Sequence, residues 1–188
     1  MEVADDAGLV SRAQRGDQAA FGEIVHRYQR GVYRVAYGLT RNASDADDLA
    51  QETFLRAYQA IARFRVGEPL YPWLTRIAIN LAYSLFRRRR RRPETPLEPL
   101  LEAGRQWAAG DDPSERVAQN ERQRHLGAAF SELSPEHQAV LVLRVVEELS
   151  YEDMAGALGV PTGTVMSRLS RARVELKSRL KARTGETS

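Results

Sequence analysis

Apolar residues in this chain recur every three or four positions, and this spacing constrains the fold more than any other feature. The longest run comprises Phe21, Ile24, Val25, Tyr28, Val32, Val35, Ala36 and Leu39. At about 100° per residue, such positions fall on one face of an α-helix. No segment shows the sustained alternation of apolar and polar residues that a half-buried strand requires. The sequence therefore predicts an all-α protein.

Proline and glycine residues interrupt the helical pattern near the middle of the chain. These helix breakers are Pro93, Pro96, Pro99, Gly104, Gly110 and Pro113. Clusters of such residues end regular structure, and a chain of 188 residues has room for two small domains. We therefore expect helical domains over residues 1–92 and 123–188, joined by a flexible linker over 93–122.

Local signals mark where several helices begin. The candidate starts are Ser44 with Asp47, Asp112 with Pro113 and Glu115, Ser134 with Pro135, and Ser150 with Asp153. A serine followed three residues later by an acid can cap the first turn, and proline suits the first helical position. A further helix is expected from Trp73 to Phe86. A short helix ending near Leu158, a turn at Gly159–Pro161 and a helix from about Thr162 predict a helix-turn-helix.

Charge is distributed unevenly along the chain. The formal net charge is +3 and the isoelectric point about 9.4. Arginines are unbroken from Arg87 to Arg92, the connector is acidic, and Ser167–Arg183 is basic again. Two basic regions separated by an acidic one indicate two contacts with a polyanion. Ordinary solvated faces are the alternative, and the arginine run could also meet a membrane surface.

The last predicted helix has the composition of a DNA-recognition helix. Val165, Leu169, Ala172, Leu176 and Leu180 form its apolar stripe. The polar side carries Thr164, Ser167, Arg168, Ser170, Arg171 and Arg173. Arginine can bond guanine bidentately, and hydroxyls can bond bases or phosphates. An amphipathic surface helix with solvated arginines would show the same pattern, so the preceding turn and short helix carry the interpretation.

A second polar surface is expected around the Trp73–Phe86 helix. Its candidate residues are Phe64, Trp73, Arg76, Asn80, Tyr83, Arg87 and Arg88. Aromatic rings offer stacking platforms for unpaired bases, and an amide can read a base edge. The arginines can neutralise backbone phosphates. Trp73 could instead belong to the core.

A third surface is the acidic face of the helix that Ser44 is expected to open. It comprises Asp45, Asp48, Gln51, Glu52 and Leu55. Acids in a first turn suit the helix dipole, but Glu52 lies beyond that turn. Such a face could dock a basic protein surface, and a solvated face explains it equally well.

No pattern in the chain indicates catalysis. There is no cysteine, no phosphate-binding glycine-lysine loop and no nucleophile elbow. His26, His125 and His137 lack metal-ligand spacing. We expect neither an enzyme nor a metal or other cofactor. The acidic N-terminus has no apolar signal core and no run is long enough to span a bilayer, so we expect a cytoplasmic protein.

The three surfaces also resemble a known family. Residues 45–54 (DADDLAQETF) resemble the core-polymerase-binding segment of extracytoplasmic-function (ECF) sigma factors of the sigma-70 family. Residues 72–82 (PWLTRIAINLA), with the arginine run that follows, resemble the minus-ten segment. Leu133-Ser134-Pro135 and residues 163–173 (GTVMSRLSRAR) resemble the minus-thirty-five domain. The order and spacing agree over nearly the whole chain.

This resemblance implies a promoter-specificity subunit of RNA polymerase. The N-terminal domain would bind the clamp coiled coil of core polymerase and melt the minus-ten element. The C-terminal domain would read the minus-thirty-five element and contact the flap, and an anti-sigma factor would hold the protein inactive. The alternatives are an autonomous helix-turn-helix regulator, which needs neither the acidic face nor the Trp73 helix, and an interaction protein that leaves both basic surfaces unexplained.

Overall fold

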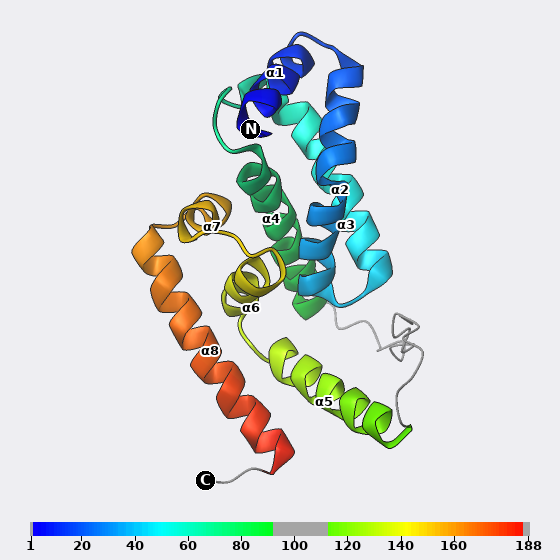
Figure 1. Ribbon diagram of the computed structural model, residues 1–188, viewed down its shortest axis with the longest axis vertical. Helices are drawn as coiled ribbons and strands as arrows, with labels where there is room; N and C mark the ends of the chain where they lie inside the picture. Colours follow the sequence, from blue (N-terminus) through cyan, green and yellow to red (C-terminus); the bar gives the residue numbers. More distant parts are fainter. Residues whose placement is uncertain (1, 92–112, 186–188) are drawn as a thin grey trace.

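The computed structural model describes residues 2–91 and 113–185, and every regular element in these two ranges is a helix (Figure 1). The N-terminal bundle consists of α1 (Glu2–Gln14), α2 (Gln18–Thr40), α3 (Ala43–Ala60), the 3-10 helix η1 (Ile61–Arg63) and α4 (Leu70–Arg91). The C-terminal bundle consists of α5 (Pro113–Ser131), α6 (Pro135–Leu141), the π-helix η2 (Val142–Val146), α7 (Tyr151–Leu158) and α8 (Thr162–Thr184). The all-α prediction is confirmed. Arg92 and the breakers from Pro93 to Gly110 lie outside the described residues.

The N-terminal bundle forms around the apolar face of α2. Ile24, Val32 and Val35 are fully buried there against α3 and α4. The helix begins after Asp17, whose carboxylate accepts the Ala20 N–H at 3.1 Å. That backbone hydrogen bond, and then the Arg12 guanidinium, hold the pKa of Asp17 below its ordinary value. The Asp17 cap and the apolar stripe therefore both stabilise α2.

The start of α3 differs from the expected one. Asn42, rather than Ser44, caps this helix, and its side-chain oxygen accepts the Asp45 N–H at 3.0 Å. Arg41 ends α2 in the left-handed conformation, with φ of 53°. Only Asn42 is then left between the two helices, so it must serve as the cap. Asparagine does so as well as serine, and Ser44 lies inside the first turn.

Helix α4 is longer than the expected Trp73–Phe86 segment. It begins at Leu70 and continues through the arginine run to Arg91. Leu74, Ala78 and Leu81 are buried along its inner face. The run is tolerated at the helix end because the C-terminal dipole attracts cations. The arginines from Arg87 to Arg91 therefore extend the helix rather than ending it.

Two helix starts in the C-terminal bundle, at Ser134 and Ser150, agree with the expected ones, while Asp112, expected to cap a third helix, lies outside the described residues. Ser134 accepts the His137 N–H at 3.3 Å, and Ser150 accepts the Asp153 N–H at 3.0 Å. Gly159, with φ of 66°, ends α7 in a conformation that favours glycine. Together α7, this turn and α8 form the predicted helix-turn-helix. Helix α5 begins at Pro113, so residues 113–122, expected in the linker, are helical.

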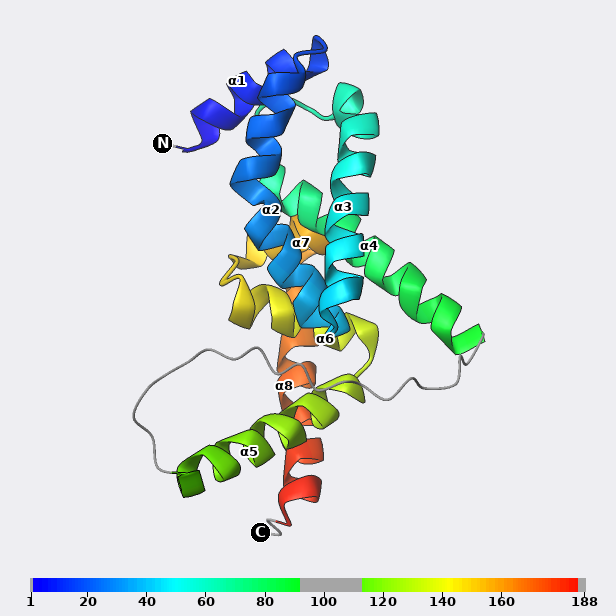
Figure 2. The same cartoon turned by 90° about the vertical axis from the view of Figure 1, so that its right-hand side faces the viewer.

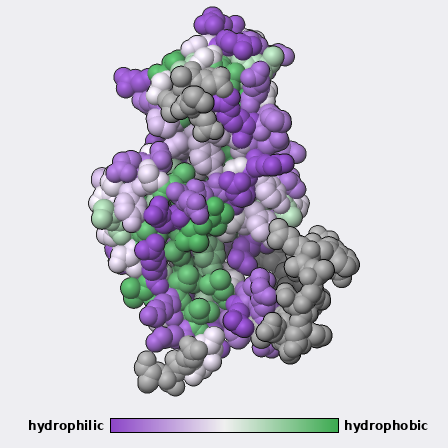
Figure 3. Space-filling model, in the orientation of Figure 1, coloured by the Kyte–Doolittle hydropathy of each residue, from purple (hydrophilic) through white to green (hydrophobic). Residues whose placement is uncertain are grey.

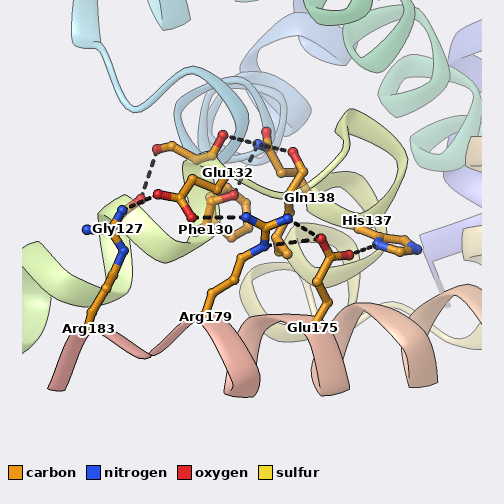
Figure 4. A network of polar contacts seen from close by, with 10 residues as sticks. Gly127, Phe130, Glu132, His137, Gln138, Glu175, Arg179 and Arg183 are labelled. Carbon is orange, nitrogen blue, oxygen red and sulfur yellow. Dashed lines mark hydrogen bonds and ion pairs between the residues drawn. The ribbon is translucent and has the colours of Figure 1, made fainter. Parts of the chain in front are cut away.

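A polar network joins α8 to the corner between α5 and α6 (Figure 4). Glu132 contacts Arg179 at 3.0 Å and also pairs with Arg183. Glu175 contacts Arg179 at 2.6 Å and the Nδ1 atom of His137 at 2.7 Å. The arginines hold the pKa values of both glutamates below their ordinary range, with His137 adding to the effect on Glu175. The network fixes the direction of the long C-terminal helix.

Gln138 completes the same corner from α6. Its buried amide donates to the backbone carbonyls of Phe130, Ser131 and Leu133 at 3.1–3.3 Å. These carbonyls follow or close the last turn of α5, where no intrahelical donor remains. Gln138 therefore replaces water at a buried helix end.

The two bundles pack against each other through one continuous apolar core. Helix α7 lies against α4, and η2 lies against α2 (Figures 1 and 2). This packing determines which parts of the predicted surfaces reach solvent. Along the described ranges, no helix combines the length and apolarity needed to cross a bilayer.

Candidate nucleic-acid interface

The outer side of α4 presents the aromatic and amide residues expected to meet unpaired bases. Trp73 is half-buried, and its ring packs on Phe64 with centroids 4.7 Å apart. Phe64 is only 8% exposed. Gln14 on α1 holds the loop by donating to the carbonyls of Ile61 and Phe64 at 2.9 and 2.7 Å. The buried Phe64 ring therefore packs against Trp73 and holds it in place.

Asn80 lies one helical turn beyond Arg76, and both side chains are exposed. Within the described residues, the Asn80 amide has no hydrogen-bond partner. Its backbone carbonyl accepts Ser84 Oγ at 2.9 Å, and Arg87 donates to the same hydroxyl at 3.0 Å. An exposed amide without a protein partner is free to bond a ligand.

Tyr83 lies on the same helix but faces the C-terminal bundle. Its hydroxyl is buried without a hydrogen-bond partner among the described residues. Burial, followed by the nearby Glu136 carboxylate, raises the pKa of Tyr83 to about 12, while Arg168 acts in the opposite direction. The hydroxyl therefore stays neutral, and the ring is wedged between the bundles.

The arginine run emerges from α4 as an exposed cationic end. Arg87 to Arg91 are all exposed. Arg89 Nη2 lies 2.8 Å from Asp45 Oδ1, while Asp45 Oδ2 is buried with no partner in the described chain. Asp45 was expected on the acidic face of α3, and the structure places it beside α4. This ion pair joins the acidic face of α3 to the arginine run of α4, which were predicted as separate surfaces.

An apolar groove lies between α2 and α3, and two of the remaining acidic-face residues line it. Asp48 is exposed, and Glu52 pairs with Arg56 at 2.7 Å. Gln51 and Leu55 line the groove, which has a volume of about 930 Å³. The other lining residues include Phe21, Val25, Tyr33, Asp47, Ala50, Phe54 and Tyr58. The α2 side of the groove could not be predicted from the sequence, because Phe21 and Val25 share the spacing of the core face.

Helix α8 presents most of its predicted polar residues to solvent. Ser167, Ser170, Arg171 and Arg173 are exposed, whereas Thr164 and Arg168 are half-buried. Arg171 folds back, and its Nε donates to the Ser167 carbonyl at 3.2 Å. Val165, Leu169 and Ala172 are buried on the opposite side. The amphipathic pattern read from the sequence is confirmed.

The structure brings the two predicted nucleic-acid surfaces face to face. A Cβ atom built on Gly159 would lie 2.8 Å from Arg76 Nη2, so this guanidinium lies against the helix-turn-helix turn. Tyr83 and Arg168 likewise influence each other across the bundles. Asn80, Arg171 and the arginine run remain open to solvent.

Comparison with known families matches both bundles. The profile described as "Sigma-70 region 2" matches residues 24–92, and "Sigma-70, region 4" matches residues 123–176. The ECF RNA polymerase sigma factor SigE of Mycolicibacterium smegmatis is 39% identical, over 92% of this chain and 67% of its own. The ECF RNA polymerase sigma-E factor of Haemophilus influenzae is 36% identical, over 95% and 97%.

Two solved structures share the arrangement of helices. CnrH, solved in complex with the cytosolic domain of CnrY, superposes with a TM-score of 0.67 at 26% identity, covering 94% of this chain and 97% of that one. The sigma factor RpoE in complex with the anti-sigma factor NepR, from Bartonella quintana, gives a TM-score of 0.66 at 27% identity, covering 86% and 96%.

Proposed function

This chain belongs to the ECF RNA polymerase sigma factors, which act in transcription initiation, and from this we propose how its surfaces divide that task. The role is one of binding, without a catalytic step of its own, and it is exerted in the cytoplasm. The partners are core RNA polymerase and promoter DNA. The DNA-facing residues of the chain supply affinity through phosphate contacts and specificity through a few base contacts.

The outer side of α4 binds the separated strand of the minus-ten element. Trp73, supported by Phe64, offers a ring for stacking, and the exposed amide of Asn80 reads a base edge. Exposed Arg76 extends this surface, and Tyr83, whose hydroxyl is buried against the C-terminal bundle, joins it once that bundle has moved. Arg87 and Arg88 hold backbone phosphates, so binding falls steeply with salt.

Helix α8 binds the minus-thirty-five element in the major groove. Its exposed polar side comprises Ser167, Ser170, Arg171 and Arg173, with Thr164 and Arg168 at its N-terminal end. Replacing a base-reading arginine costs about 1–3 kcal/mol at the matching base pair and nothing elsewhere, whereas a phosphate contact weakens every promoter alike. Arg171→Ala, assayed on promoters altered one base pair at a time, separates these roles.

The α2–α3 groove and its acidic rim bind the clamp coiled coil of core polymerase. The observation that carries this assignment is the exposure of apolar side chains beside the exposed carboxylate of Asp47, which lines the groove. Leu55 is 59% and Tyr58 46% exposed at the groove. Asp48 and Glu52 directly follow the lining residues Asp47 and Gln51 along α3. Such a patch indicates a protein partner. A regulator that binds DNA without polymerase would not need this groove.

Apolar residues also gather on the surface of the C-terminal bundle (Figure 3). Val174 is 68% and Leu126 44% exposed there. This surface is our candidate for the polymerase flap. An anti-sigma factor is a further expected partner, because the RpoE relative was solved in complex with one.

The polymerase assignment is tested by charge reversal at the groove rim. Asp48→Lys combined with Glu52→Lys should abolish core binding in a pull-down while leaving the thermal melting curve intact. The matched control is Glu23→Lys combined with Glu121→Lys, which makes the same charge change at exposed sites away from the groove. Equal core binding by both double variants would contradict the assignment.

A further inference from the structure

Met166 is an apolar residue on the solvent side of helix α8, among the residues assigned above to the minus-thirty-five element. It lies within the first two turns of the helix and is 52% exposed. The core does not need it, because Val165, Leu169 and Ala172 already form the buried stripe of α8. Packing within the chain therefore does not account for a methionine at this position.

Met166 lies where a recognition helix meets the base pairs. The N-terminal residues of such a helix contact base edges in the major groove, and α8 begins at Thr162, directly after the turn that follows α7 (Figure 1). Ser170, four residues further on, lies within about 40° of Met166 around the helix axis, and both side chains are exposed. Met166 therefore shares one side of the helix with a residue of the predicted polar face.

The surface beside Met166 is open. Helical side chains lean toward the N-terminus of their helix, so Met166 points toward the turn that contains Gly163, three residues earlier. A Cβ atom built on Gly163 would meet nothing within 4 Å, so none of the described residues covers this turn. A base edge can therefore approach the backbone closely here, with the Met166 side chain beside it.

Two polar side chains of the same helix are already bonded within it. The Ser167 hydroxyl donates to the Thr164 carbonyl at 3.0 Å. Arg171 donates from Nε to the Ser167 carbonyl at 3.2 Å and from Nη2 to the Ser167 hydroxyl at 3.3 Å. These donors must leave their present partners before they can read a base. An apolar contact made by Met166 breaks no hydrogen bond of the helix, so it carries no such cost.

The DNA group that suits a methionine side chain is the C5-methyl group of thymine. Thymine alone presents a methyl group in the major groove, while the other bases are distinguished there by their hydrogen-bonding groups. A thioether has no hydrogen to donate and is a weak acceptor, so it is poorly suited to those groups. It is also flexible and polarisable, so it adapts to an apolar neighbour. Methionine at this position therefore favours thymine.

We propose that Met166 is a specificity-determining residue that reads the C5-methyl group of one thymine in the minus-thirty-five element. The inference rests on the proposed function, because α8 must first lie in the major groove. It deepens that function by adding an apolar selection to a surface whose other assigned residues all carry hydrogen-bonding groups. The selection acts on a methyl group alone and is separate from any hydrogen bond to the same base pair.

Deoxyuridine tests this reading, because it lacks the methyl group of thymine and keeps every hydrogen-bonding group of the base. In a promoter that the wild-type holoenzyme transcribes, each thymine of the minus-thirty-five element, on either strand, is replaced in turn. Holoenzyme binding to each duplex is then measured by competition at one fixed salt concentration. Met166→Ala removes the apolar group. Val145→Ala is the matched control, since Val145 is an apolar residue that is 65% exposed on η2 rather than on α8.

One thymine should give a response that depends on Met166. There, the wild-type and Val145→Ala holoenzymes should bind the deoxyuridine duplex about fourfold more weakly than the thymine duplex, which is the factor that burial of one methyl group provides. The Met166→Ala holoenzyme should bind the two duplexes equally. Both variants should keep the wild-type Tm, because both side chains are exposed.

Two results would overturn the inference. Wild-type binding that is indifferent to every thymine methyl group of the element, or an element without thymine on either strand, would mean that Met166 reads no methyl group. A deoxyuridine penalty that persists in Met166→Ala would mean that another residue reads it. A wild-type holoenzyme that initiates without any minus-thirty-five element would instead contradict the assignment of α8 in the proposed function, and the inference would fall with it.

Discussion

Removing the Glu147 carboxylate should release the C-terminal bundle from α2 and α4. Arg34 donates to this carboxylate from Nε and Nη2, both at 2.8 Å, and the Tyr71 hydroxyl donates to it at 2.5 Å. The Tyr71 contact has an ionised acceptor and is worth about 1.5–3 kcal/mol. Arg34 is 53% exposed, so its ion pair contributes only about 0.2–1 kcal/mol after solvent screening. Alanine also removes a buried charge that was costly to desolvate. The net effect of Glu147→Ala is therefore about 1–3 kcal/mol in favour of opening, which corresponds to a factor of about 5–150.

The rate of thiol labelling measures this opening, because the rate keeps rising with the open population. Val142 is 3% exposed and faces Gly38, so Val142→Cys places a single thiol in the covered interface of a chain that otherwise has none. While the packed arrangement of the two bundles predominates, the labelling rate of this thiol is proportional to the population in which they have separated. Adding Glu147→Ala should accelerate labelling by the factor given above.

The control for this measurement is the neighbouring glutamate. Glu148 is exposed and lies outside the contact, so Glu148→Ala should leave the labelling rate of Cys-substituted position 142 unchanged. Equal rates in the two alanine variants would refute the reasoning, because Glu147 would then contribute nothing to closure.

Three further perturbations probe polar side chains at and between the helix ends. Tyr83→Phe removes a hydroxyl that has no partner, so it should stabilise the protein by about 1 kcal/mol and raise Tm in calorimetry; a lower Tm would mean that the hydroxyl is satisfied. Gln138→Ala removes the side-chain donor to the carbonyls of Phe130, Ser131 and Leu133, of which only Phe130 keeps a backbone donor, the Leu133 N–H. The variant should cost about 1–3 kcal/mol in chemical denaturation, whereas exposed Gln123→Ala should cost almost nothing. Because the folded pKa values of Glu132 and Glu175 are depressed from 4.5, their contribution is present at neutral pH and is lost as pH falls below that value through the folded pKa values. The Tm measured by circular dichroism should therefore fall more steeply with decreasing pH in the wild type than in a variant with glutamine at both positions.

Helix identities were predictable because their signals are local. Serine caps at positions 134 and 150 and the glycine that ends α7 act within one turn, and the structure places helices there. The Ser44 cap was wrong because Asn42 competes two residues earlier, and the choice between them depends on where α2 ends. The buried faces of α2, α4 and α8 were predictable for the same reason, because the spacing of apolar residues along a helix is also a local signal.

Contacts between the bundles could not be predicted in this way. Glu147 shows no pattern in the sequence that relates it to Arg34 or Tyr71, and Gly38 is one of several glycines in its helix. The apolar groove was hidden because Val25 and Phe21 share the spacing of core residues. The roles of individual DNA-facing residues stay predictions, since they depend on a partner that the chain alone does not define.

The measurement that tests the central claim most directly is run-off transcription with purified core polymerase on a library of randomised promoters. The account predicts that adding this protein produces defined start sites whose upstream sequences share a minus-ten and a minus-thirty-five element. Asn80→Ala should alter the base preference at one minus-ten position while preserving Tm. Transcripts indistinguishable from those of core polymerase alone would contradict the account.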